Sequence, residues 1–174
     1  AVKKYFEDVI EKIYLHSDGA PIYKCYDVGE LIQRIACLVH MRRPFFKLKD
    51  FSEDAMVMLK LFEAIFREDK KIKAAFSTPE EIQRERVLRI GPMLNDMKSY
   101  LDKLAKNLEK EEEPELLKAV NYALVEYPCM LRCLEDGTLA CRITYVSDRL
   151  EELRSIAIIV ILLAVLKQVC ALLA

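Results

Sequence analysis

One stretch of the sequence carries residue types that could bind an anion, because cations and aromatic rings alternate between positions 40 and 49. Its members are Arg42, Arg43, Phe45, Phe46, Lys47 and Lys49. Cations of this kind contact phosphate groups, while the rings can insert into a membrane surface or stack on a ligand. The alternative is a loop whose phenylalanines enter the core while its cations stay in water. These six residues are the candidate contact to an anion, a membrane surface or a protein partner.

Residues suited to catalysis or metal binding are few and dispersed. The two histidines, His16 and His40, lie in no recognisable nucleophile pattern, and the sequence has no glycine-rich phosphate loop or HExxH motif. The six cysteines form no CxxC pair, which favours buried, reduced thiols over disulfides or a zinc site; they stand at positions 25, 37, 129, 133, 141 and 170. The sequence therefore predicts no catalytic residue, no metal ligand, no cofactor and no enzyme activity.

The composition is typical of a helical protein. Apolar residues make up 53% of the 174 positions, and there are four glycines and six prolines. The 27 basic and 28 acidic residues nearly cancel, so no overall positive field points to nucleic acid, and nucleic acid is not expected as a partner. We expect one helical domain over residues 1–174, located in the cytoplasm or at a membrane surface. Because the chain starts at Ala1 without a methionine, it fits a piece of a longer chain.

Helical spacing and capping signals predict the elements that would position these residues. Apolar residues spaced three and four apart predict a helix over residues 2–15 and another from Asp27 that ends before Pro44. Ser52 is the expected cap of a helix over residues 53–76, whose Met and Phe stripe should face the core.

Residues 78–81, Thr-Pro-Glu-Glu, form a capping box for the next helix. Gly91 and Pro92 should break or kink that helix, and a second piece should run to about Glu109. A further helix should begin near Pro114 and end at Pro128.

The last part of the chain predicts two further features. Residues 129–146 flank Asp136-Gly137, which suits a tight turn and predicts one small β-hairpin, with a helix-turn-helix as the alternative. Residues 148–174 read as a helix, apolar all round from Ile156 to Leu166, that must be surrounded by protein or lipid. It is long enough to span a bilayer as a tail anchor, but Lys167 and the missing flanking charges favour a central core helix.

The combined expectation is an all-α bundle of six or seven helices around the apolar C-terminal helix. Its predicted role is non-enzymatic, as a regulatory or interaction domain that binds another protein or an upstream domain of its own chain. Many helices, a small late β element and a terminal apolar helix are similar in architecture to the C-terminal autoinhibitory domains of gasdermins. That resemblance implies an autoinhibitory role in a membrane-active or cell-death protein. A bundle that holds lipid or another hydrophobic ligand is the remaining alternative.

Overall fold

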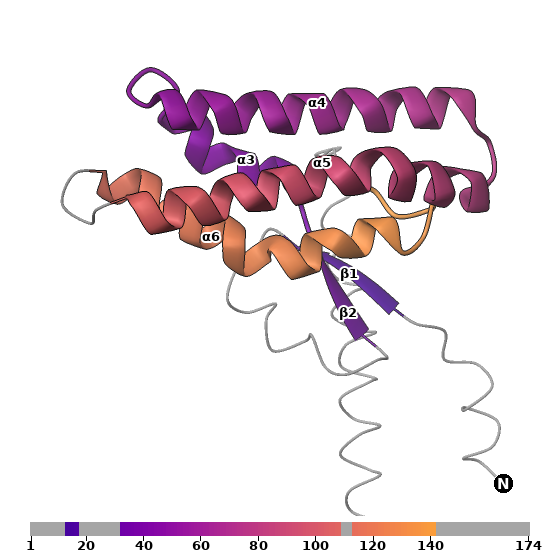
Figure 1. Cartoon of the computed structure of the whole chain (residues 1–174). Helices are drawn as coiled ribbons and strands as arrows, with labels where there is room; N and C mark the ends of the chain where they lie inside the picture. Colours follow the sequence, from indigo (N-terminus) through magenta and orange to yellow (C-terminus); the bar gives the residue numbers. More distant parts are fainter. Residues whose placement is uncertain (1–12, 18–31, 109–112, 142–174) are drawn as a thin grey trace, which may run out of the picture. The chain divides into compact units, whose positions relative to one another are not determined.

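The computed structural model describes residues 13–17, 32–108 and 113–141. By its internal contacts the chain divides into two compact units, residues 1–143 and residues 144–174, and every described residue belongs to the first. The elements described, in chain order (Figure 1), are strands β1 (Ile13–Ser17) and β2 (Ile32–Ala36), helices α3 (Leu38–Lys47), α4 (Glu53–Ala75), α5 (Pro79–Asn107) and α6 (Pro114–Leu131), and the 3-10 turn η1 (Arg132–Leu134).

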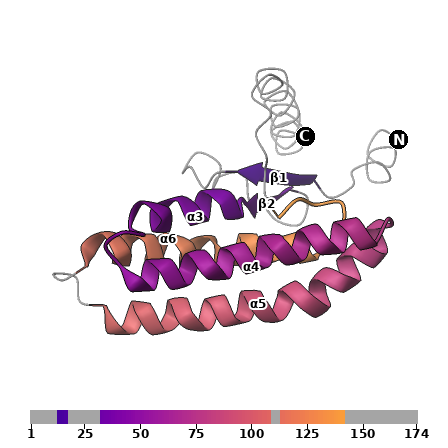
Figure 2. The ribbon, with the colours of Figure 1, turned by 90° about the horizontal axis from the view of Figure 1, so that it is seen from above.

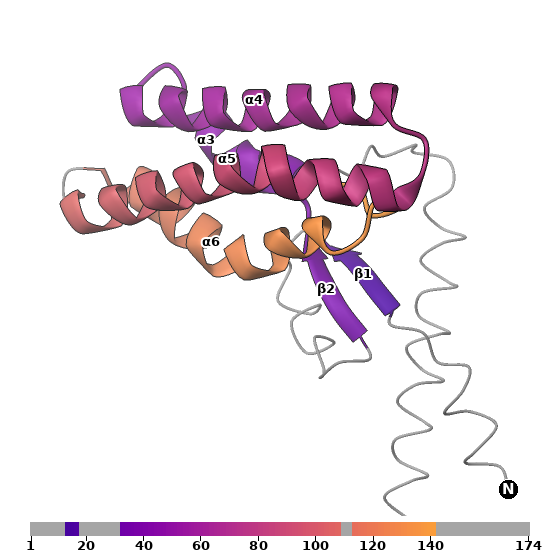
Figure 3. The same cartoon turned by 45° about the vertical axis from the view of Figure 1, so that its right-hand side comes forward.

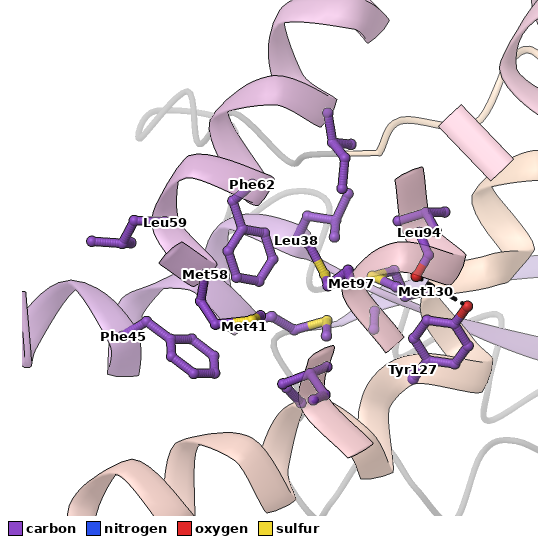
Figure 4. Packing of buried hydrophobic residues seen from close by; sticks show 14 of the residues in the cluster. Leu38, Met41, Phe45, Met58, Leu59, Phe62, Leu94, Met97, Tyr127 and Met130 are labelled. Atoms are coloured by element: carbon purple, nitrogen blue, oxygen red, sulfur yellow. Dashed lines mark hydrogen bonds between the residues drawn. The ribbon is translucent and has the colours of Figure 1, made fainter. Parts of the chain in front are cut away.

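The four helices pack around a common core. Helix α4 contacts α3 and α5, and α6 contacts the same two helices, so the four elements close a ring (Figure 2). Each helix contributes one fully buried methionine to the core, where flexible thioethers fill irregular space (Figure 4); these are Met41, Met58, Met97 and Met130. At one side of the core, the hydroxyl of Tyr127 donates to the Leu94 carbonyl at 3.3 Å.

Two predicted helix starts are confirmed with their capping contacts. The Ser52 hydroxyl accepts from the amide of Ala55 at 3.3 Å and begins α4. At α5, the Thr78 hydroxyl accepts from the Glu81 amide at 3.3 Å, while the Glu81 carboxylate accepts from the Thr78 amide at 3.3 Å. These reciprocal bonds satisfy two backbone donors that a helix N-terminus otherwise leaves unpaired.

Three helices continue through a proline, so the predicted helix ends at Pro44 and Pro128 are wrong, and so is a break at Pro92. A kink, the other outcome predicted at Pro92, is compatible with one continuous helix. Pro44, Pro92 and Pro128 lie inside α3, α5 and α6. A proline removes one backbone bond and leaves the carbonyl four residues earlier without its partner. In α5 both Pro92 and Leu88, the residue that bears this carbonyl, are exposed, so water can replace the lost donor. The residues around Gly91 therefore belong to one helix of 29 residues.

Strands replace parts of two predicted helices. Residues 13–17 and 32–36 form the parallel pair β1 and β2, with Ile13 opposite Ile32 and Ser17 opposite Ala36 (Figure 3). Five residues are too few for apolar spacing to separate a strand from a helix. The expectation of an all-α chain of six or seven helices is corrected accordingly: the described residues hold four α-helices and a two-stranded parallel sheet.

The predicted hairpin near residues 129–146 is also wrong as far as the structure describes it. Residues 129–131 end α6, η1 follows, and residues 135–141 form an irregular loop. The Asp136 carboxylate accepts from the Thr138 amide at 2.7 Å, which closes a local turn. Gly137 is needed for space, because a Cβ added there would meet the Pro79 carbonyl oxygen at 1.9 Å. This loop is therefore packed against the first residue of α5.

The predicted C-terminal helix over residues 148–174 lies outside the described residues, as do Cys25 and Cys170. Among the helices that are described, none combines the length and the apolar character needed to cross a bilayer.

Candidate functional site

The six residues singled out from the sequence lie on α3 and the turn that follows it, and not in a loop between helices. Phe45 is fully buried and packs against Phe62 of α4, with ring centroids 6.1 Å apart. Phe46, the next residue, is 46% exposed. The structure therefore divides the two rings: Phe45 belongs to the core, and Phe46 remains available at the surface.

Two of the four cations contact the exposed ring of Phe46. Arg43, Lys47 and Lys49 are exposed, and Arg42 is half-buried and donates to the Glu63 carboxylate at 3.4 Å. The Arg42 guanidinium carbon lies 5.0 Å from the Phe46 ring centroid, and the Lys49 ammonium lies 4.7 Å from it. Both distances are typical of cation–π contacts, which hold the charged groups near the ring and leave their hydrogen-bond donors usable.

A shallow hollow of about 370 Å³ borders this surface where the end of α3 meets the start of α6. It is lined by Pro44, Lys47, Leu48, Glu115, Lys118 and Ala119. Lys118 donates to Glu115 at 2.6 Å, so part of its charge is already balanced. The hollow adds an apolar edge to the cationic surface and no catalytic group.

A buried arginine, which sequence reasoning missed, organises the region between α4, α5 and the loop after η1. Arg86 of α5 is fully buried, and its Nε donates to Asp69 of α4 at 2.8 Å. Its Nη1 donates to the Leu139 carbonyl at 2.7 Å, and the carbonyls of Cys133, Asp136 and Gly137 each lie 3.4 Å away. One guanidinium therefore holds the whole loop to the helices.

Asp69 receives further partners that compensate its burial. Lys73, one turn later on α4, places its ammonium 2.8 Å from the other carboxylate oxygen. The Cys141 thiol donates to Asp69 at 3.7 Å. A hydrogen bond between Cys133 and Cys141 lowers the pKa of Cys133 and raises the pKa of Cys141, and burial adds to the second shift. The loop is thus tied to α4 and α5 through backbone and thiol groups together.

A second buried arginine connects the sheet to α6. Arg34 of β2 pairs with the fully buried Glu126 of α6 at 2.5 Å and also donates to the Ser17 hydroxyl at 3.2 Å. Its other amino group donates to the Cys129 sulfur at 3.1 Å. Arg132 of η1 donates to the Arg34 carbonyl at 2.7 Å. The network joins the two strands to α6 and η1. It therefore fixes how β1 and β2 pack against the helices.

The sequence contains a signal that would have found these networks. Asp69 occupies the same stripe as Phe62, Ile65 and Ile72, and Arg86 lies four residues before Ile90 on the buried face of α5. A charged residue on an apolar stripe is stable only if a partner meets it there. Opposite charges on the stripes of consecutive helices therefore indicate a buried pair.

The described residues offer little for redox or metal chemistry. The four described cysteines, at positions 37, 129, 133 and 141, are buried and form no disulfide with one another. Within residues 13–17, 32–108 and 113–141, no three His, Cys, Asp or Glu side chains lie close enough together to hold a metal ion. His16 in β1 is partly buried, and burial lowers its pKa.

The described residues define a mainly helical domain on a small parallel sheet, with a cationic surface on α3 and charged pairs in its interior. The chain matches the family model described as Transposase IS66 family over residues 2–142 of 174, and it therefore belongs to that family. No curated protein and no solved structure matches the chain.

This membership corrects several expectations from the sequence. A transposase family points to a transposase-related function, not to an interaction or regulatory domain, autoinhibition, cell death or a lipid-binding bundle. The family also points to DNA as a partner, contrary to the expectation of no nucleic acid, and conflicts with the expectation of no enzyme activity. The near-zero net charge misled because net charge averages over the chain, while contact with DNA needs cations on one surface only.

Proposed function

We propose that this chain acts on DNA in transposition and that the cationic surface of α3 is one of its contacts with the DNA backbone. Family membership over residues 2–142 is the observation that carries the first part. The second part is supported by local charge: residues 38–51 contain four cations, Arg42, Arg43, Lys47 and Lys49, and one acid, Asp50. Neutralising phosphates with lysine and arginine supplies most of the sequence-independent affinity for DNA.

The exposure of the cations favours phosphate contact over a purely structural role. Arg43 and Lys47 are exposed on the same helix, one turn apart, and neither forms an ion pair with an acid among the described residues. In contrast, Lys118 at the start of α6 is paired with Glu115. An exposed cation without an acidic partner is stable in water. It can replace a counterion at a DNA phosphate.

Cleavage of a DNA strand is a more specific activity than DNA binding. We propose it for the whole protein and not for the described residues alone. Nucleases commonly use metal ions held by carboxylates, which stabilise the attacking and leaving oxygens while a nucleophile such as water displaces the leaving oxygen of the phosphodiester. No such group of ligands occurs in the part of the chain that the structure describes. We therefore assign DNA binding to the described residues and no cleavage step to any of them.

The test compares two double variants of the full chain. Arg43→Gln with Lys47→Gln removes two cations from α3, while Arg67→Gln with Lys70→Gln removes an exposed arginine and lysine from α4. Binding to a labelled duplex is measured by fluorescence anisotropy at several salt concentrations. The α3 variant should bind more weakly, with a log–log salt slope reduced by about two units, because each duplex phosphate contact adds about 0.9.

The control should keep the affinity and slope of the unaltered chain. Equal losses in the two variants would assign binding to general charge and not to α3. If the unaltered chain binds no duplex at low salt, the proposed contact is wrong.

A further inference from the structure

The corner between α3 and α4 exposes a second aromatic ring next to the cationic surface. Phe51, in the turn between these helices, is 87% exposed, and Phe46 on the last turns of α3 is 46% exposed. Burying a phenylalanine side chain lowers the free energy. A ring that is exposed to water can therefore stabilise a complex with a partner that covers it. We call Phe46, Lys49 and Phe51 the α3–α4 corner.

The backbone that carries Phe51 is fixed on both sides. The Leu48 carbonyl accepts from the amides of Phe51 and Ser52, both at 3.0 Å. Leu48 itself packs against the core, and the Ser52 hydroxyl caps α4 through Ala55. The turn that carries the exposed ring is therefore ordered, so little backbone entropy is lost when a partner stacks on the ring.

Both cations and acids lie near the exposed ring, so charge alone does not determine what binds at the corner. Lys49 lies against Phe46 at 4.7 Å, with Arg43 and Lys47 on the preceding turns. Asp50 and Glu53, both exposed, flank Phe51 and weaken the attraction for several phosphates at that point. Binding at the corner must then depend on the ring as well as on charge.

We propose that the α3–α4 corner binds an unpaired stretch of DNA, with Phe51 stacking on a base and Lys49 and its neighbours holding the adjoining phosphates. The inference rests on the proposed function, since it names the form of DNA that this surface takes. Unpaired bases offer a free π-face to an aromatic ring, and proteins that bind single strands combine such rings with cations. A duplex keeps its base faces stacked, so Phe51 gains little from it.

The experiment measures the affinity of the full chain for two probes by fluorescence anisotropy. One probe is a labelled thymidine oligonucleotide of about 20 nucleotides, and the other is a duplex of the same length. Phe51→Ala should weaken binding of the single strand about fivefold or more, while duplex affinity changes less than about twofold. Phe51→Trp keeps a stacking ring and should restore single-strand binding.

Leu88→Ala is the matched control, because Leu88 is also an exposed apolar residue, 63% exposed, but lies on α5. It should leave both affinities unchanged. An unchanged single-strand affinity in Phe51→Ala would overturn the inference, as would equal losses for both probes. If Phe51→Ala reduced binding to phosphatidylserine vesicles and not to the oligonucleotide, the corner would be a membrane contact instead.

The outcomes separate this inference from the proposed function. Duplex binding that depends on Arg43 and Lys47, with no effect of Phe51→Ala on single-strand binding, would keep the α3 contact and refute the stacking role. If the unaltered chain does not bind the duplex, the proposed contact between α3 and DNA is itself refuted.

Discussion

Arginine has opposite roles in two regions of this protein. Arg86 is fully buried and is bound by a carboxylate and several carbonyl oxygens, whereas Arg43 on α3 is exposed. A buried guanidinium must keep every partner it has, because the cost of removing it from water is large. An exposed one costs little and can exchange water for a phosphate. The comparison separates residues that stabilise the fold from exposed residues that we propose to contact DNA.

The largest expected effect on the free energy of unfolding comes from substituting the buried Arg86. Arg86→Met leaves Asp69 buried with only Lys73 and the Cys141 thiol, and leaves the loop carbonyls without their donor. We expect the free energy of unfolding in urea to fall by about 3–5 kcal/mol. Arg84→Met, on the same helix but exposed, should change it by less than about 0.5 kcal/mol.

Equal effects of these two substitutions would contradict the distinction between the regions. Adding Asp69→Leu to Arg86→Met should recover part of the loss, since replacing both members of a buried pair removes the unpaired charge.

The second largest effect on stability is expected at Gly137 and tests how tightly the loop of residues 135–141 packs against α5. Gly137→Ala places a Cβ against the Pro79 backbone and should lower the free energy of unfolding by about 1–3 kcal/mol. Gly91→Ala lies inside α5, where the nearest side-chain atom would be 3.9 Å away, and should raise it by up to about 1 kcal/mol. Thermal unfolding of both variants would show shifts of opposite sign. An unchanged or higher melting temperature for Gly137→Ala would mean that the loop does not press on Pro79.

The smallest effect concerns pH and the strand β1. Burial lowers the pKa of His16, so the folded state binds a proton less readily than the unfolded state. At pH values above the unfolded pKa of about 6.5 both states are neutral, and the histidine has no effect on pH dependence. As the pH falls through 6.5 the unfolded state takes up the proton first, and stability is lost.

His16→Gln should remove this part of the acid dependence. Urea unfolding at pH 8 and pH 5.5 should show a smaller difference for the variant than for the unaltered chain. An identical difference would mean that His16 carries its ordinary pKa in the folded protein.

The sequence predicted those parts of the fold that depend on local signals. The starts of α4 at Ser52 and α5 at Thr78 follow from capping chemistry within four residues, and both are confirmed. The strands were missed because β1 and β2 are five residues each and are stabilised by pairing with one another. Pro92 was misread because the cost of a proline depends on whether water can reach the freed carbonyl, and the residue that bears it, Leu88, is exposed.

The candidate site was predicted in part. The basic and aromatic residues of α3 were identified, but only the structure distinguishes the buried Phe45 from the exposed Phe46. Phe51 was missed because its exposure depends on the turn that follows α3. Arg86 and Asp69 lie 17 positions apart and meet only when α4 and α5 pack together.

The way Arg86 holds the loop has a consequence for how the chain can change during evolution. Its loop partners are backbone carbonyls, which every amino acid provides, and not side chains. Substitutions at the loop's exposed positions therefore leave the anchor intact. The constraint falls instead on three distant positions: the arginine itself, its carboxylate partner Asp69, and Gly137, where no side chain fits. Relatives with unlike loop sequences can thus keep the same attachment between loop and helices.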